Sequence, residues 1–338
     1  MKVLIENIGG YIMNMLNEKL AERNAKLTKC SLFCKLDYQD QEDYKNIFKS
    51  NVEILSKSIE CSLEKQNNSK NKILVKYNDL DNNAIIPQAY SKLIDGEYIG
   101  EVIINIGLLI HLYEMFYDLN YKTFVPDGKN IDNIKKMMFS TSVNIILCHE
   151  VAHIYYRHEL LKRELLTKYG SDSIKYKLDI QTLEYDADAF AITKMYEFIT
   201  KLQEYSTPAQ SKLYYQIFIY SLHALIYLFR QTDDFDYVTE HPAFFIREKA
   251  MLKVVNNLFN NHESKAYIDF AEKEFNRQFE INEEILNSYY EKMESFTIQL
   301  TNIEKNYDSL KYDIKRFSRL PVEGIDYPDY RNLFSKHL

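Results

Sequence analysis

The chain has 338 residues, of which 46% are apolar, and a formal net charge of -7 at pH 7. This length and composition predict a globular protein with a hydrophobic core rather than a disordered chain. No block of Lys and Arg provides a basic face, so a nucleic-acid partner is excluded from our expectations. With only 8 Gly and 6 Pro, long helices are favoured over many short strands.

The first twenty residues contain Glu and Asn where a signal peptide would need an unbroken apolar core. The apolar run over 99–116 is interrupted by polar side chains, which argues against a membrane span. The four cysteines form no C-x-x-C pair and are expected to be reduced, buried thiols: Cys30, Cys34, Cys61 and Cys148. These features predict a cytoplasmic protein without a membrane span.

Residues 1–80 are expected to form an N-terminal helical segment, with helices over 11–24 and 41–64; whether it is a lid or a recognition element stays open. Short β-branched runs over 72–77 and 100–106 predict strands of a small sheet. Beyond residue 107 the apolar spacing becomes helical, over 108–119, 133–168, 182–205, 209–231 and 244–260. The predicted fold class is mostly α (α+β).

The C-terminal segment, residues 263–338, contains apolar residues at alternating spacings of three and four over 286–317. This heptad pattern predicts one long helix. Two interpretations stay open: the helix lies on its own domain, or it forms a coiled-coil contact with a protein partner or a second copy of the chain.

The motif His149-Glu150-x-x-His153 carries the chemistry of the sequence. Helical positions four apart differ by about 40° in direction, so both imidazoles face the same side and can meet one zinc ion. Glu150 lies one step around the helix, where it can take a proton from a metal-bound water molecule. The motif therefore predicts two ligands and a general base.

A catalytic zinc needs a third protein ligand, and TLEYDADAFA supplies candidates. Glu184 is the best assignment, and Asp188, one turn later, is spaced to hold the far nitrogen of a ligating histidine. Asp186 is the rival for both roles but is predicted to face solvent. The alternative is that these carboxylates are only an acidic first helical turn. His158 could also ligate.

HEVAHIYYRH followed by EYDADAFA resembles the gluzincin peptidases related to HtpX and the CAAX prenyl protease. The resemblance covers roughly 83–250, including GEVIINIGLLIHL and, loosely, EHPAFFIRE. It implies a zincin-like domain over 81–262, an active-site helix carrying the motif, and one zinc ion. It also implies that His241 stabilises the oxyanion, although a turn residue is an equal alternative, and that Arg247 supports the site or pairs with Glu240 or Glu248.

Members of that group are commonly anchored in membranes, a property not carried over because this chain has no predicted span. The chain is also similar to the phage-exclusion peptidases of the Lit type, intracellular zinc proteases that act on a host protein. The predicted function is a zinc metalloendopeptidase acting on a protein or peptide that pairs with the strand over 101–106. The alternative is a zinc-containing regulatory or binding module with little catalysis.

Overall fold

A computed structural model describes 72–78, 88–94, 97–117, 131–230 except residue 205, 244–258 and 283–318, with scattered positions over 42–57 and 265–273. The described part of the chain is mostly helical, which confirms that part of the predicted fold class. The predicted helix over 11–24 and His241 lie outside the described residues. No helix among the described residues is long and apolar enough to cross a membrane.

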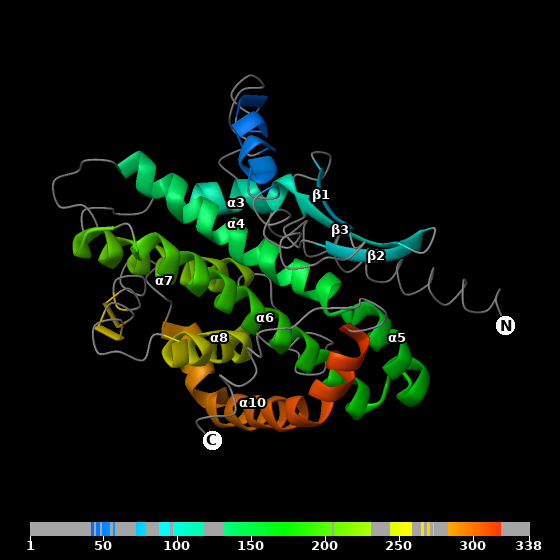
Figure 1. The fold of residues 1–338 in the computed structure, drawn as a ribbon. Coiled ribbons are helices and arrows are strands. Elements are labelled where there is room, and N and C mark those ends of the chain that lie inside the picture. Colours follow the sequence, from blue (N-terminus) through cyan, green and yellow to red (C-terminus); the bar gives the residue numbers. More distant parts are fainter. Residues whose placement is uncertain are drawn as a thin grey trace.

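Three strands form one sheet: β1, Lys72–Asn78; β2, Gln88–Ile94; and β3, Glu97–Asn105. Their order in the sheet is β1-β3-β2. β1 runs parallel to β3, and β2, which the sequence pattern did not predict, runs antiparallel to it (Figure 1). β3 is therefore the central strand. The expectation that a substrate pairs with β3 is wrong, because both of its edges are already occupied along most of its length.

The sheet leads directly into the core. α3, Ile106–Tyr117, follows β3 without a loop, and most of its apolar side chains are buried. β2 and β3 also contact α4, Ile131–Tyr155. At Gly100 any Cβ atom would overlap the side chain of Ile154, so glycine is needed for β3 to lie this close to α4.

The single helix predicted over 133–168 is wrong, because the chain breaks after the motif. α4 ends at Tyr155, and α5, His158–Tyr169, begins after a turn in which Arg157 has φ 55° and ψ 40°. A left-handed conformation costs a residue with a Cβ atom about 1–3 kcal/mol. Arg157 is buried, so the surrounding packing holds it there, and α5 leaves in a new direction.

Three further helices pack around α4 and each other: α6, Ile174–Gln203; α7, Pro208–Arg230; and α8, Phe244–Leu258. α6 and α7 lie beside α4, and α8 lies against α6 (Figure 1). α6 starts well before the predicted residue 182, so Glu184 is roughly three turns inside the helix. Its position excludes the interpretation of Glu184 as part of an acidic first turn. Pro208 begins α7, where its missing N–H costs no helical hydrogen bond.

The heptad segment forms α10, Glu283–Ser318, which packs against α5, α6 and α8. Its apolar seam is buried within the chain: Phe296, Ile303, Tyr307, Leu310, Ile314 and Phe317. Asn306 fixes its place by donating to Asp179 and Thr182 of α6, each at 2.8 Å. This part of the seam cannot meet a second chain unless α10 leaves its own domain.

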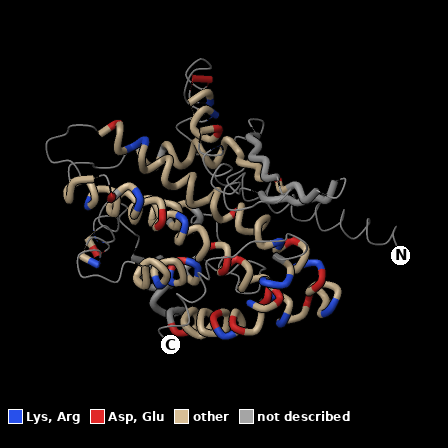
Figure 2. Tube along the Cα trace, in the orientation of Figure 1, with Lys and Arg blue, Asp and Glu red and all other residues tan. Residues whose placement is uncertain are grey.

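Charged side chains are distributed unevenly between the buried helix α4 and the outer helices α5 and α10. Figure 2 shows dense charges of both signs along α5 and α10, whereas α4 carries charged residues mainly near its two ends. The low charge of α4 agrees with its position between the sheet and the helices α6 and α7.

Candidate metal centre

α4 presents the two motif histidines on one face. The Nε2 atoms of His149 and His153 lie 3.1 Å apart, as the spacing of four residues predicts. Glu150 lies between them in sequence and is 8% exposed. The helix thus brings two imidazole nitrogens to one point, with the buried Glu150 on the same turn.

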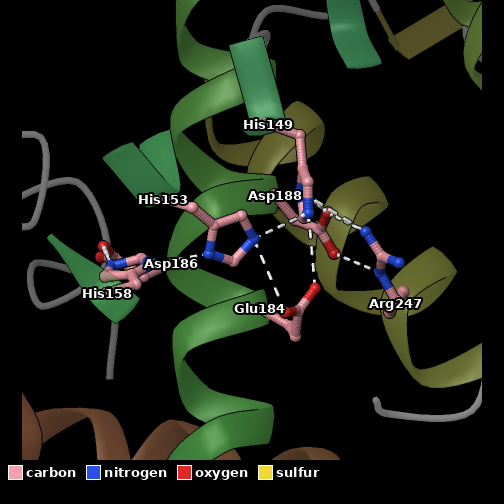
Figure 3. Close-up of polar contacts among 7 residues, drawn as sticks. All are labelled: His149, His153, His158, Glu184, Asp186, Asp188 and Arg247. Carbon is pink, nitrogen blue, oxygen red and sulfur yellow. Dashed lines mark hydrogen bonds and ion pairs between the residues drawn. The ribbon is translucent and has the colours of Figure 1, made fainter. Parts of the chain in front are cut away.

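α6 brings Glu184 to the same point. Its carboxylate oxygens lie 3.4 Å from Nε2 of His149 and 3.6 Å from Nε2 of His153 (Figure 3). The ligand atoms of these three residues all fall within 4.8 Å of one another. Among the described residues, this cluster is the group of His, Cys, Asp and Glu that could hold a metal ion.

The spacing can be compared with zinc coordination. Zn–N and Zn–O bonds of about 2.0–2.2 Å at tetrahedral angles place neighbouring ligand atoms roughly 3.3–3.5 Å apart. The two histidine nitrogens lie 3.1 Å apart, and each lies near a different oxygen of Glu184, at 3.4 and 3.6 Å. Two imidazoles and one carboxylate are also the ligand set of zinc hydrolases that keep a fourth position for water. The residues present therefore fit a catalytic zinc ion.

Asp188 and Arg247 form an ion pair, which we call the clamp, beside Nδ1 of His149. Asp188 Oδ1 lies 2.8 Å from Nδ1 of His149, so the ring can donate to this carboxylate. Arg247 of α8 donates to both oxygens of Asp188, at 2.6 and 2.8 Å. Arg247 therefore forms a bidentate ion pair with Asp188. This contact agrees with the expectation that Arg247 supports the site, rather than with a pairing to Glu240 or Glu248.

The clamp shifts the pKa values of its members. Burial alone would raise the pKa of Asp188, but the Arg247 guanidinium outweighs it and lowers that pKa below its usual range. Burial would lower the pKa of His149, but hydrogen bonds with Asp188 and Glu184 raise it to about 10. The high pKa of His149 reflects the negative potential of these carboxylates, which favours a cation at the cluster.

His153 is held by a different arrangement, which we call the imidazole relay: His158 and Asp186. Nδ1 of His158 lies 3.0 Å from Nδ1 of His153, and Nε2 of His158 lies 3.2 Å from Asp186 Oδ2 (Figure 3). Asp186 is 6% exposed, so the prediction that it faces solvent is wrong. Its carboxylate points toward α5, a neighbour that the geometry of α6 alone does not reveal.

Three other groups considered from the sequence stand apart from the cluster. Cys148 lies in the hydrophobic core, where burial raises the pKa of its thiol to about 12. His223 is buried on α7, with Nδ1 3.8 Å from a carboxylate oxygen of Glu248. His111 is half-buried on α3.

A comparison with protein families gives a match to the model described as Peptidase U49, over residues 44–271. The chain belongs to the peptidase U49 family. The matched region covers two thirds of the chain and contains every residue of the cluster, the clamp and the relay. No curated protein and no solved structure matches the chain.

Within this peptidase, sequence reasoning missed the pairing of Arg247 with Asp188 and the relay behind His153. The first joins residues on α6 and α8, and the second joins α5 and α6. One sequence signal was available for the relay: Asp186 is flanked by Tyr185 and Ala187, two residues that are often buried. Its partner still depended on where the chain breaks after α4.

Proposed function

We propose that this member of the peptidase U49 family is a zinc-dependent endopeptidase of the gluzincin type, with a zincin-like domain over 81–262. His149, His153 and Glu184 would hold the metal. One observation carries the proposal: two imidazole nitrogens and a carboxylate from α4 and α6 meet at separations close to those of a tetrahedral zinc site. The family match supports the peptidase activity itself.

A bound zinc ion would supply Lewis acidity, polarising the scissile carbonyl and lowering the pKa of a water molecule. Glu150 is proposed to take the proton from that water and to deliver it to the leaving amine. Its carboxylate is buried, and it contributes, with Asp188 and Glu184, to the negative field that raises the pKa of Arg247.

We propose that His241 donates to the oxyanion that develops in the transition state. The support is its place in the sequence: it lies three positions before the first residue of α8, and Arg247 of α8 pairs with Asp188 beside His149. The substrate is proposed to be a protein or peptide. Pairing with β3 is not part of this proposal, since β1 and β2 occupy the edges of that strand.

The alternative is a regulatory or binding module that holds zinc but has little catalysis. Glu150 is the feature that separates the two functions, because a structural metal site needs no base. A purified protein should contain one zinc ion per chain under either interpretation, and only a peptidase should lose its activity when Glu150 is changed.

The test compares wild type with Glu150→Gln and with Glu159→Gln, a matched change of a more exposed glutamate on α5. New protein N-termini would be mapped by mass spectrometry in cells expressing each form. We expect cleavage sites with wild type and Glu159→Gln, their loss with Glu150→Gln, and bound zinc in all three proteins. Equal cleavage by Glu150→Gln contradicts the mechanism, and wild-type protein without zinc contradicts the metal assignment.

A further inference from the structure

His158 occupies an unusual place behind a metal-facing histidine. It is 2% exposed, and its ring lies between Nδ1 of His153 and the carboxylate of Asp186. Tyr156 stacks on the ring, with centroids 5.7 Å apart and planes inclined by 23°. The imidazole is therefore held on its face by an aromatic ring and at both nitrogens by polar partners.

The backbone places His158 there by leaving the helix. On a continuous helix, residues 153 and 158 would differ by about 140° in direction, so their rings could not meet. The turn after Tyr155, with Arg157 left-handed, redirects His158 toward His153. Non-glycine residues held in this conformation cluster at functional sites.

The hydrogen bonds of the relay run in one direction. An ionised carboxylate can only accept a hydrogen bond, so Nε2–H of His158 donates to Asp186. In a neutral imidazole the other nitrogen, Nδ1 of His158, is then an acceptor. Nδ1–H of His153 then donates to that acceptor. The remaining nitrogen of His153, Nε2, carries a lone pair and faces Glu184 and His149.

We propose that His158 and Asp186 are a positioning pair that fixes the tautomer and ring orientation of His153 for metal binding. This inference rests on the proposed zinc site. Ligating histidines are commonly held at their other nitrogen by a carboxylate or a carbonyl group. Here a second imidazole stands between the ligand and the carboxylate, so Asp186 acts on the metal position through two rings.

The experiment measures zinc affinity by competition with a chelator. His158→Phe removes the acceptor but keeps a ring for Tyr156, and Asp186→Leu removes the carboxylate. We expect each to lower the affinity for zinc by roughly 10- to 100-fold. Asp186→Asn keeps an oxygen that can accept from His158, so its loss of affinity should be smaller. Leu161→Ala is the control, because it removes buried side-chain volume from the same helix but none of the polar atoms of the relay.

A second measurement needs no variant and no metal. Long-range proton–nitrogen NMR of the metal-free protein should find the proton of His153 on Nδ1. A proton on Nε2 overturns the inference.

Wild-type affinity in His158→Phe also overturns it, and so does an equal loss in Leu161→Ala. If either result is found while the wild-type protein binds zinc, the positioning role of His158 is refuted but the proposed function still stands. Wild type that binds no zinc overturns both.

Discussion

The two histidines of the proposed metal site stand one turn apart on α4, yet the Nδ1 atoms of their rings are held by different chemistry. His149 meets an ionised carboxylate that is paired with Arg247. His153 instead meets an imidazole nitrogen of His158, whose other nitrogen contacts Asp186. α6 supplies both carboxylates, while α8 completes one side and α5 the other. The comparison teaches that each histidine depends on a different helix outside the motif.

The two sides should also differ in how strongly they resist substitution. The clamp contains a buried charge pair, so removing one member leaves the other charge without its partner. The relay consists of hydrogen bonds between His153, His158 and Asp186. Of these three residues, only Asp186 would be left as a buried charge without a partner if the hydrogen bonds were lost. Variants of the clamp should therefore affect both folding and the metal, and variants of the relay should mainly affect the metal.

Glu184 belongs to both sides, and changing it gives the largest expected effect on the metal. Glu184→Ala should lower zinc affinity by more than the roughly 100-fold expected for an outer residue, because a direct ligand is lost. Chelator competition would measure it. Glu197→Ala, on the same helix and paired with Lys194, is the control and should bind zinc like wild type. Equal affinity in the two variants would refute the assignment of Glu184.

Arg247→Met breaks the clamp. Asp188 would remain buried without its guanidinium partner and with His149 alone beside it, so the free energy of unfolding should fall by up to about 3–5 kcal/mol. Urea denaturation would measure the change. Arg316→Met removes an arginine from an exposed pair with Glu164 and should leave stability close to that of wild type. Similar losses in both variants would show that burial of the clamp contributes nothing.

Asp188→Asn and Asp186→Asn compare the two sides directly. Asp188 touches a ligating ring, whereas Asp186 acts through His158, so Asp188→Asn should have the larger effect on zinc affinity, about 10- to 100-fold. Titration calorimetry with zinc would measure both. A larger loss for Asp186→Asn would reverse the comparison.

Gly100→Ala should have the smallest effect and act on the site from a distance. The added methyl group overlaps Ile154, next to His153, and overpacking of this kind costs about 1–3 kcal/mol of stability. Zinc affinity should fall modestly as α4 shifts. Gly170→Ala is the control: Gly170 has φ 79° with open space around it, so the substitution strains the backbone but should leave zinc affinity unchanged. Thermal unfolding and chelator competition would separate the two effects.

The motif residues could be predicted because their geometry is local. His149 and His153 share a face through helical spacing alone, and the same spacing relates Glu184 to Asp188. Glu184 could be named as a candidate ligand from its place in the sequence, but its meeting with the histidines depended on α6 lying beside α4. The prediction that Asp186 faces solvent was wrong, and the pairing of Arg247 with Asp188 was missed, because each of these contacts joins two different helices.

The sequence by itself determined the helical character, the two histidines on one face and the carboxylates available to them, since these follow from spacing along one helix. Only the tertiary structure decided that β3 is a central strand, that the seam of α10 lies on its own domain, and that Asp186 is buried. The physical reason is that these features depend on contacts between distant segments. The break at Arg157 is one example: a single left-handed residue, held by packing, turns His158 toward His153.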